Sequence, residues 1–92
     1  MLRFNFKESA DREAVEDDLG VAIFAAECVY GKPRVRMEAS YLVDEDGKSC
    51  ALDVRGEAGE AAARIFAGIA AARVGEAGFS VRREAAPAGA LS

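Results

Sequence analysis

The chain has 92 residues, of which 51% are hydrophobic and 30% are charged, and this composition indicates one globular domain and excludes a disordered chain. Its formal net charge of −4 argues against non-specific binding to nucleic acid or to anionic lipid. Histidine is absent, which excludes an imidazole general base, a Ser/His or Cys/His nucleophile pair, and a zinc site with histidine ligands.

The N-terminal segment MLRFNFKES alternates apolar and polar side chains, which predicts a short strand. Its charges at Arg3 and Lys7 argue against a signal peptide. The longest uncharged apolar stretch, residues 65–72, is much shorter than the ~20 residues that cross a bilayer. We therefore expect no membrane segment. The two cysteines, Cys28 and Cys50, lack C-x-x-C spacing and suit reduced thiols in the cytoplasm.

A helix is predicted next, with Ser9 as its cap and acidic residues in its first turns, where the helix dipole favours them. Gly31 and Pro33 provide its stop. Gly20 interrupts the pattern, and residues 21–30 are apolar on every side, so a buried strand is the alternative for this part. The apolar positions at helical spacing are Val15, Leu19, Ala22, Ile23, Ala26 and Tyr30.

Two strands joined by a tight turn are predicted between residues 34 and 55, because apolar and polar residues alternate in RVRMEASYLV and in SCALDVR. A two-residue type I′ loop at Asp46-Gly47 matches apolar residues across the two strands. A loop one residue longer would move the side chains of one strand to the opposite face of the sheet. The pairs predicted by this register are Ala39–Val54, Tyr41–Leu52, Val43–Cys50 and Glu38–Arg55.

The acidic turn DEDGK also invites comparison with a calcium-binding loop. With Gly47 as the loop glycine, three aspartates fall at the third, fifth and twelfth ligand positions, namely Asp44, Asp46 and Asp53. Leu42, however, stands where the first aspartate is needed, and strands replace the flanking helices. We therefore predict a hairpin turn with no metal ion, and no residue pattern in the chain predicts a cofactor.

The last part of the sequence predicts a second helix in EAGEAAARIFAGIAAARV and a final strand in FSVRR. Gly75 or Gly78 ends the helix, and Glu60 and Arg64 form an i,i+4 pair on its outer side. We expect residues 1–84 to form one α+β domain and residues 85–92 to form a mobile tail. The predicted apolar side of this helix comprises Ala58, Ala62, Ile65, Phe66, Ile69 and Ala72.

The order strand, helix, strand, strand, helix, strand resembles the ferredoxin-like βαββαβ plan, in which an antiparallel sheet carries two helices on one face. The alternative architecture is a helix followed by a β-meander, a second helix and a final strand, and it applies if residues 21–30 are extended. The resemblance concerns the fold alone, since this fold carries many unrelated functions.

Two charged surfaces follow from this plan. The first helix presents an acidic edge, and the open face of the sheet presents arginines, so either surface could steer a partner of opposite charge. The alternative interpretation is that these charges only keep the surface solvated. The candidate partner-binding residues are Glu13, Glu16 and Asp17 on the helix and Arg34, Arg36 and Arg55 on the sheet.

These observations favour a non-enzymatic protein–protein interaction or regulatory module, with an unidentified protein partner or a homodimer. One alternative is an acidic inhibitor that covers a basic nucleic-acid-binding surface of its partner. The other is a ferredoxin-like ligand- or RNA-binding module, which the expected inward orientation of the strand aromatics disfavours. An enzyme is disfavoured because both cysteines are expected in apolar surroundings, which raise a thiol pKa.

Overall fold

The computed structural model describes residues 1–7, 12–45 and 47–83. The predicted cap at Ser9 and the predicted tail, residues 85–92, lie outside the described residues. The elements in chain order are β1 (Leu2–Phe6), α1 (Arg12–Tyr30), α2 (Lys32–Glu38), β2 (Ala39–Val43), β3 (Ser49–Val54), α3 (Gly56–Val74), the 3₁₀ helix η1 (Glu76–Gly78) and β4 (Phe79–Arg83).

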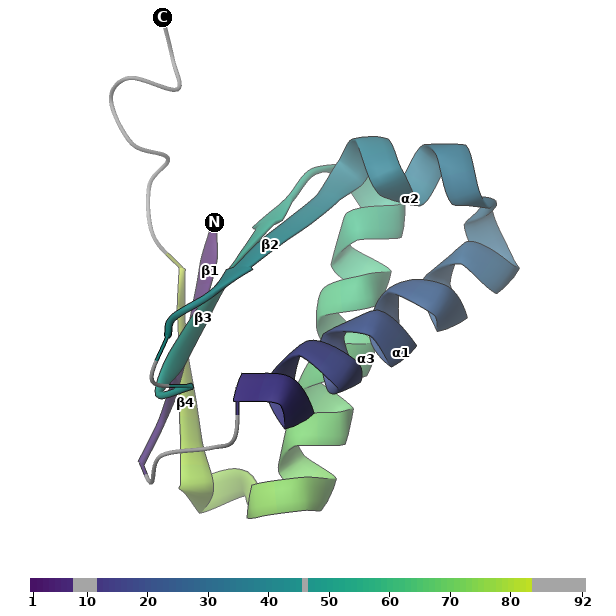
Figure 1. The fold of residues 1–92 in the computed structure, drawn as a ribbon. Helices are drawn as coiled ribbons and strands as arrows, with labels where there is room; N and C mark the ends of the chain where they lie inside the picture. Colours follow the sequence, from purple (N-terminus) through teal and green to yellow (C-terminus); the bar gives the residue numbers. More distant parts are fainter. Residues whose placement is uncertain (8–11, 46, 84–92) are drawn as a thin grey trace, which may run out of the picture.

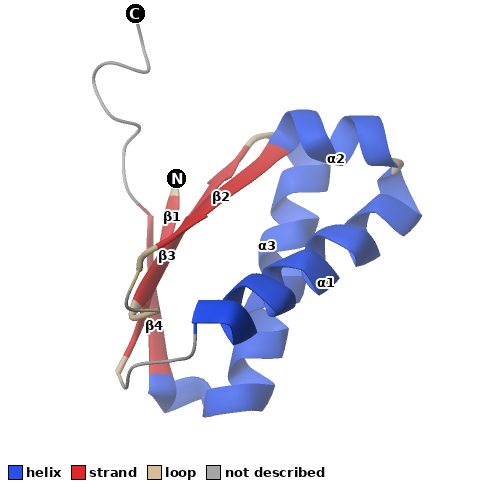
Figure 2. Cartoon of the chain, viewed as in Figure 1, coloured by secondary structure: helices blue, strands red, loops and turns tan. Residues whose placement is uncertain are grey.

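The four strands form one antiparallel sheet in the order β2-β3-β1-β4. Helices α1 and α3 contact each other and lie on the same side of this sheet (Figures 1 and 2). The α+β class is confirmed. The predicted two-helix plan differs from the structure, because a third helix, α2, stands between α1 and β2.

Helix α1 confirms the helical interpretation of residues 21–30 and excludes the extended alternative. One side of the helix is buried against the rest of the domain, and its alanines let that side approach closely. Ile23 and Tyr30, also predicted on this side, are half-buried. The buried residues of α1 are Val15, Asp18, Leu19, Ala22 and Ala26.

The predicted strand over residues 34–43 is wrong in its first half, which forms α2. Gly31 separates the two helices with a φ of 90°, and Pro33 lies in the first turn of α2, where its missing N–H is tolerated. Val35 is completely buried whereas Met37 is 80% exposed, and a strand would have turned both inward. Val35 instead fills a small cluster between the helices with Ala26, Ala58 and Ala62.

The strand register of the hairpin is as predicted, with the pairs Ala39–Val54, Tyr41–Leu52 and Val43–Cys50. Its turn, however, begins one residue earlier than the predicted loop. Gly47 donates its N–H to the carbonyl of Asp44 at 3.0 Å, and Asp44 donates to the carbonyl of Ser49 at 3.0 Å. The number of loop residues between Asp44 and Ser49 is even, as in the predicted loop, so the same faces point inward.

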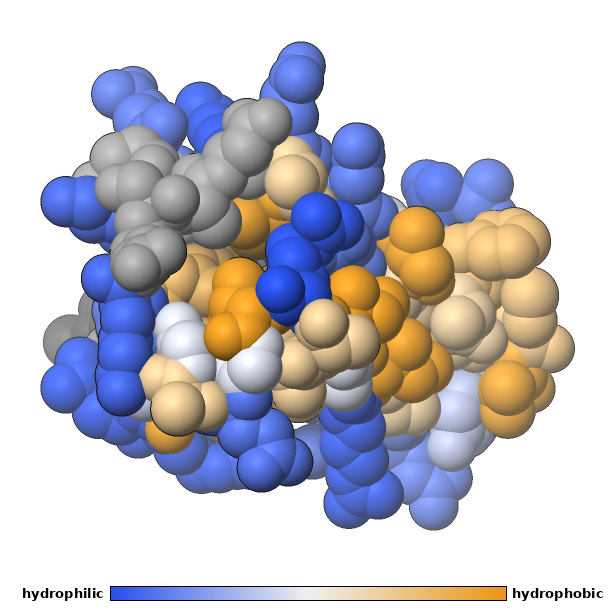
Figure 3. All heavy atoms as spheres, turned by 90° about the horizontal axis from the view of Figure 1, so that it is seen from below, coloured by the Kyte–Doolittle hydropathy of each residue, from blue (hydrophilic) through white to orange (hydrophobic). Residues whose placement is uncertain are grey.

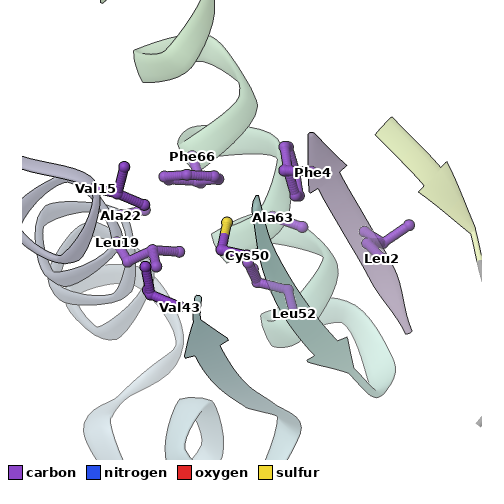
Figure 4. Packing of buried hydrophobic residues seen from close by; sticks show 10 residues of the cluster. All are labelled: Leu2, Phe4, Val15, Leu19, Ala22, Val43, Cys50, Leu52, Ala63 and Phe66. Carbon is purple, nitrogen blue, oxygen red and sulfur yellow. The ribbon is translucent and has the colours of Figure 1, made fainter. Parts of the chain in front are cut away.

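The main core lies between the sheet, α1 and α3 (Figure 4). Phe4 of β1 and Phe66 of α3 meet edge to face, with ring centroids 4.9 Å apart and an interplanar angle of 78°. Ala72, predicted on the apolar side of α3, is exposed instead. The ten residues of this core are Leu2, Phe4, Val15, Leu19, Ala22, Val43, Cys50, Leu52, Ala63 and Phe66.

Glu38, the last residue of α2, closes the N-terminus of α3. Its Oε1 accepts a hydrogen bond from the backbone N–H of Ala58 at 3.0 Å, and its Oε2 accepts one from Nε of Arg34 at 2.9 Å. Its carbonyl accepts one from the N–H of Arg55 at 2.7 Å, which continues the predicted hairpin register to Glu38 and Arg55. A side chain on Gly59 would overlap this carbonyl, so the close approach requires glycine there.

The environment of the Glu38 carboxylate favours its charged form. The hydrogen bond from Arg34 is the largest cause of a lowered Glu38 pKa, and the N–H of Ala58 adds to it, whereas burial opposes both. The carboxylate thus satisfies a helix N–H and places negative charge at the positive end of the α3 dipole.

We expect the substitution Glu38→Gln to lower the thermal unfolding midpoint at pH 7 by a few degrees, as loss of a charged helix cap does. Because the folded-state pKa is lowered, the stabilisation is present above the unfolded pKa of about 4.3 and is lost as the pH falls through the folded pKa. The difference in thermal unfolding midpoint between the variant and the wild type should therefore become smaller as the pH falls towards 3.

The matched control for this variant is Glu57→Gln, which neutralises an exposed carboxylate in the first turn of the same helix. Thermal unfolding followed by circular dichroism between pH 3 and pH 7 measures both variants. Equal effects of the two substitutions at pH 7 would contradict a specific role for Glu38.

Candidate partner-binding surface

The three acidic candidates lie in the first half of α1. Glu13 and Asp17 are exposed, and Glu16 is half-buried and forms an ion pair with Arg12 at 3.0 Å. Glu13 and Asp17 are four residues apart and therefore share one side of the helix. Part of the predicted acidic edge is thus present as a solvent-facing surface.

Asp18, the acid next to these candidates, has a structural role that the sequence did not indicate. It is buried, and its carboxylate accepts hydrogen bonds from Nε and Nη2 of Arg73 at 2.6 and 2.8 Å. These hydrogen bonds are the main cause of a raised Arg73 pKa. The pair joins α1 to the last turn of α3, across 55 residues of sequence.

The three basic candidates do not share a sheet face, so that prediction is wrong. Arg34 and Arg36 lie on α2, because a helix replaces the first half of the predicted strand, and Arg55 precedes α3. The guanidinium of Arg34 also lies 5.1 Å from the centre of the Tyr30 ring. The ion pairs join Arg34 to Glu38 at 2.9 Å, Arg36 to Glu27 at 3.8 Å and Arg55 to Asp53 at 3.5 Å.

A line of exposed apolar residues lies on the outer side of α1. We call Val21, Phe24 and Cys28 the apolar α1 face; Val21 is 58% exposed, Phe24 is 66% exposed and Cys28 is exposed. Their spacing of three and four residues puts them on one side of the helix, opposite its buried side. Asp17 and Glu13 continue the same line towards the N-terminus. Apolar residues gather on the side of the molecule that Figure 3 shows, with hydrophilic residues around them.

An open groove with a volume of about 480 Å³ lies beside this face, between α1 and β2. Strand β2 is an edge strand of the sheet, and Tyr41 on it is 41% exposed. An exposed strand edge beside an apolar helix is a common feature of surfaces that bind other chains. The groove is lined by Gly20, Ile23 and Glu27 of α1, Arg36 of α2, and Ala39, Ser40 and Tyr41 of β2.

The two cysteines differ in their surroundings. Cys50 is completely buried, and burial is the main cause that raises the pKa of its thiol to about 12. Cys28, which was predicted to be buried, is exposed, because the core-facing side of α1 is formed by Ala22 and Ala26 instead. A helix that is apolar on every side does not reveal from sequence which side the core covers.

Within residues 1–7, 12–45 and 47–83, no group of three or more His, Cys, Asp or Glu residues is arranged to hold a metal ion. Asp44 of the acidic turn accepts a hydrogen bond from the hydroxyl of Ser49, and Asp46 lies outside these ranges. Over the same part of the chain, no helix combines the length and the apolar character that crossing a membrane requires.

Comparison of the chain with protein-family models, with curated proteins and with solved structures found no match.

The apolar α1 face was not predicted, although the sequence contains a signal for it. Val21, Phe24 and Cys28 repeat at helical spacing, just as Val15, Leu19, Ala22 and Ala26 do on the other side. Two apolar lines on one helix indicate that one of them lacks a partner within a small domain, because only one can face a single core.

We expect thiol reagents to distinguish the cysteines at micromolar protein concentration. Cys28 should react rapidly in the native protein, whereas Cys50 should react only at the rate of unfolding, because it is buried and its thiol pKa is raised. Ellman's reagent with the variant Cys28→Ser measures this difference. A rapid reaction of the variant, or slow modification of both thiols in the wild type, would contradict these positions.

We also expect the acidic turn to bind neither calcium nor magnesium specifically. Leu42 stands in place of the first ligand, and the Asp44 carboxylate already accepts a hydrogen bond from the Ser49 hydroxyl. Amide NMR signals of Asp44, Asp46 and Asp53 should hardly move when either ion is added to millimolar concentration. A saturable shift centred on these residues, absent from Asp44→Asn, would show that a site exists.

Proposed function

We propose that the protein is a non-enzymatic protein–protein interaction module that binds its partner through the apolar α1 face. The observation that carries this proposal is the exposure of Val21, Phe24 and Cys28 along one line of a helix whose opposite side is already buried. Single exposed apolar residues are ordinary on protein surfaces, whereas contiguous ones mark interaction sites. Aromatic residues such as Phe24 are enriched at the centres of interfaces.

The charged residues have a secondary role in this proposal, which is to orient the partner. Glu13 and Asp17 lie at one end of the same helix line, where they would steer a partner and fix its orientation. The acidic inhibitor alternative has less support, because Asp18 is buried against Arg73 and Glu16 is paired with Arg12. Fewer acidic side chains are left to face a basic groove than the sequence suggested.

The ligand- or RNA-binding alternative also has less support. The Phe79 ring lies near those of Phe4 and Phe6, with centroids 6.2 and 6.3 Å away; Phe4 belongs to the core, and Phe6 and Phe79 pack against it. Bases stack on aromatic side chains that face outward from a sheet, which these do not. We also propose that the domain is a variant of the ferredoxin-like plan, with α2 added to the connection between α1 and β2, and that it works in the cytoplasm, where exposed Cys28 would remain a free thiol.

The proposal is tested by comparing Phe24→Glu with Val81→Glu, which places the same charge at an exposed apolar position of β4. A tagged wild-type protein first captures its partner from a lysate of the source cells, and the purified partner is then used for binding kinetics. We expect Phe24→Glu to weaken binding at least about tenfold, because buried aromatic anchors dominate interface energies. Val81→Glu should bind like the wild type.

The triple variant Glu13→Lys, Glu16→Lys, Asp17→Lys separates the acidic alternative from this proposal. We expect it mainly to slow association and to reduce the salt dependence of the rate. Loss of binding in this variant, with normal binding by Phe24→Glu, would instead assign the interface to the acidic residues. Circular dichroism of each variant checks that the fold is retained.

A further inference from the structure

We propose that strand β2 pairs with β2 of a second copy of this chain, antiparallel across a twofold axis, so that the two sheets join into one. This inference goes beyond the proposed function, because it concerns the edge of the sheet and not the apolar α1 face. Twofold homodimers are the commonest oligomers of soluble proteins, and each uses one self-complementary surface. An open strand edge supplies such a surface through its backbone.

The hydrogen bonds of the hairpin show which backbone groups of β2 point away from β3. At one end of the strand, the carbonyl of Glu38 accepts a hydrogen bond from Arg55. At the other end, the N–H of Asp44 donates one to Ser49. Bonded residues alternate with non-bonded ones along an antiparallel ladder, so both neighbours of Tyr41 are bonded to β3 and Tyr41 is not. The N–H and the carbonyl of Tyr41 therefore point outward from the sheet.

β2 is the less protected of the two edge strands (Figure 1). Its sequence, ASYLV, contains neither a charge nor a proline, whereas β4 carries Arg82 and Arg83, and charges on an edge strand oppose the addition of another strand. The three central residues of β2 are exposed although they alternate between the two faces of the sheet. The groove between α1 and β2 leaves room for the side chains of an added strand.

The register of the pairing follows from the outward groups of Tyr41. In an antiparallel pair with a twofold axis, the five residues of β2 overlap fully when Tyr41 lies opposite Tyr41 of the second copy. Each Tyr41 N–H then donates to the carbonyl of the other, as in a hydrogen-bonded pair of an antiparallel ladder. The same register puts Ala39 opposite Val43 and the two Tyr41 rings side by side, and aromatic pairs across strands are stabilising.

The charges beyond the two ends of β2 select a second copy as the partner. Arg36 stands before the strand, and Glu45 stands in the turn after it. Although Arg36 belongs to α2, it lines two hollows that both adjoin Ala39 and Ser40, so it lies beside the start of the strand. In the antiparallel pair, the basic end of each strand meets the acidic end of the other, and symmetry produces this contact twice.

The side chains at these ends are available for the contact. Arg36 is 66% exposed, and its Nε lies 3.8 Å from Glu27, beyond hydrogen-bond distance, so its N–H donors can bind a second carboxylate. Glu45 is exposed. Glu38 and Asp44 fall opposite each other in this register, but each carboxylate already accepts a hydrogen bond within its own chain.

The expected strength of this dimer is moderate. A pair of five-residue strands covers less than the ~800 Å² per partner of a standard interface, and such small interfaces are typically transient. We therefore expect the wild type to change from monomer to dimer as its concentration rises from micromolar to millimolar, which sedimentation equilibrium measures.

Amide hydrogen exchange tests the strand pairing directly. At micromolar concentration, the amide of Tyr41 should exchange rapidly, whereas those of Ser40 and Leu42 should exchange slowly because they are bonded to β3. At millimolar concentration, the exchange rate of Tyr41 alone among these three should fall about tenfold. The matched control is Val81 on the other edge, whose amide points away from β1 by the same alternation and should exchange rapidly at both concentrations.

Charge exchange tests the position of the twofold axis. Tyr41→Lys and Tyr41→Glu should each weaken self-association by about tenfold, because each puts two like charges directly opposite one another. Mixed in equal amounts, the two variants should form a heterodimer, which unequal labels identify. Val81→Lys and Val81→Glu are the controls and should associate like the wild type, and circular dichroism checks the fold of each variant.

Dimerisation that slows exchange at Tyr41, together with the heterodimer, supports the pairing of two β2 strands. A wild type that stays monomeric at millimolar concentration overturns it. A dimer in which the Tyr41 amide still exchanges rapidly overturns it as well, as does a mixture of the two Tyr41 variants that associates no better than each alone. The variant Phe24→Glu tests the proposed function separately, through a different surface.

Discussion

The contact between Glu38 and the N-terminus of α3 determines where the helices stand. Glu38 is the last residue of α2. Its carbonyl accepts the first hydrogen bond of the hairpin, and its carboxylate caps α3. Such a junction leaves little freedom, because Gly59 brings the two backbones into direct contact. With α2 fixed there, Val35 enters the space between the helices, and the C-terminal half of α1 acquires its buried side.

The outer side of α1 is therefore held in place from both ends. Asp18 binds Arg73 near the start of the helix, and Glu27 faces Arg36 near its end. Between these points, Leu19, Ala22 and Ala26 are fully buried. A helix anchored in this way presents its exposed line in a fixed shape, which lowers the entropic cost of binding.

Local patterns in the sequence predicted much of the fold, and non-local contacts account for the errors. The hairpin register followed from alternation and loop parity, both of which are local. In RVRMEAS, by contrast, alternation fits a strand and also a short helix after Gly31-Lys32-Pro33. The choice depends on burying Val35 between two distant helices and on the contact of Glu38 with α3. Cys28 was misplaced and the burial of Asp18 was missed for the same reason, since only the tertiary packing decides which side of α1 is covered.

The candidate site was predicted in part. The structure makes the apolar α1 face a stronger candidate source of affinity than the charged residues. The charged residues were identified from the sequence, yet each of the candidate arginines Arg34, Arg36 and Arg55 has an acidic neighbour within the chain. An exposed ion pair contributes only about 0–1 kcal/mol, so these charges are poor sources of affinity. Apolar burial contributes about 25 cal/mol per Å², and Phe24 alone offers a large exposed ring. An interface on α1 would therefore take its affinity from the apolar line, and Asp17 and Glu13 at the end of that line would determine its orientation.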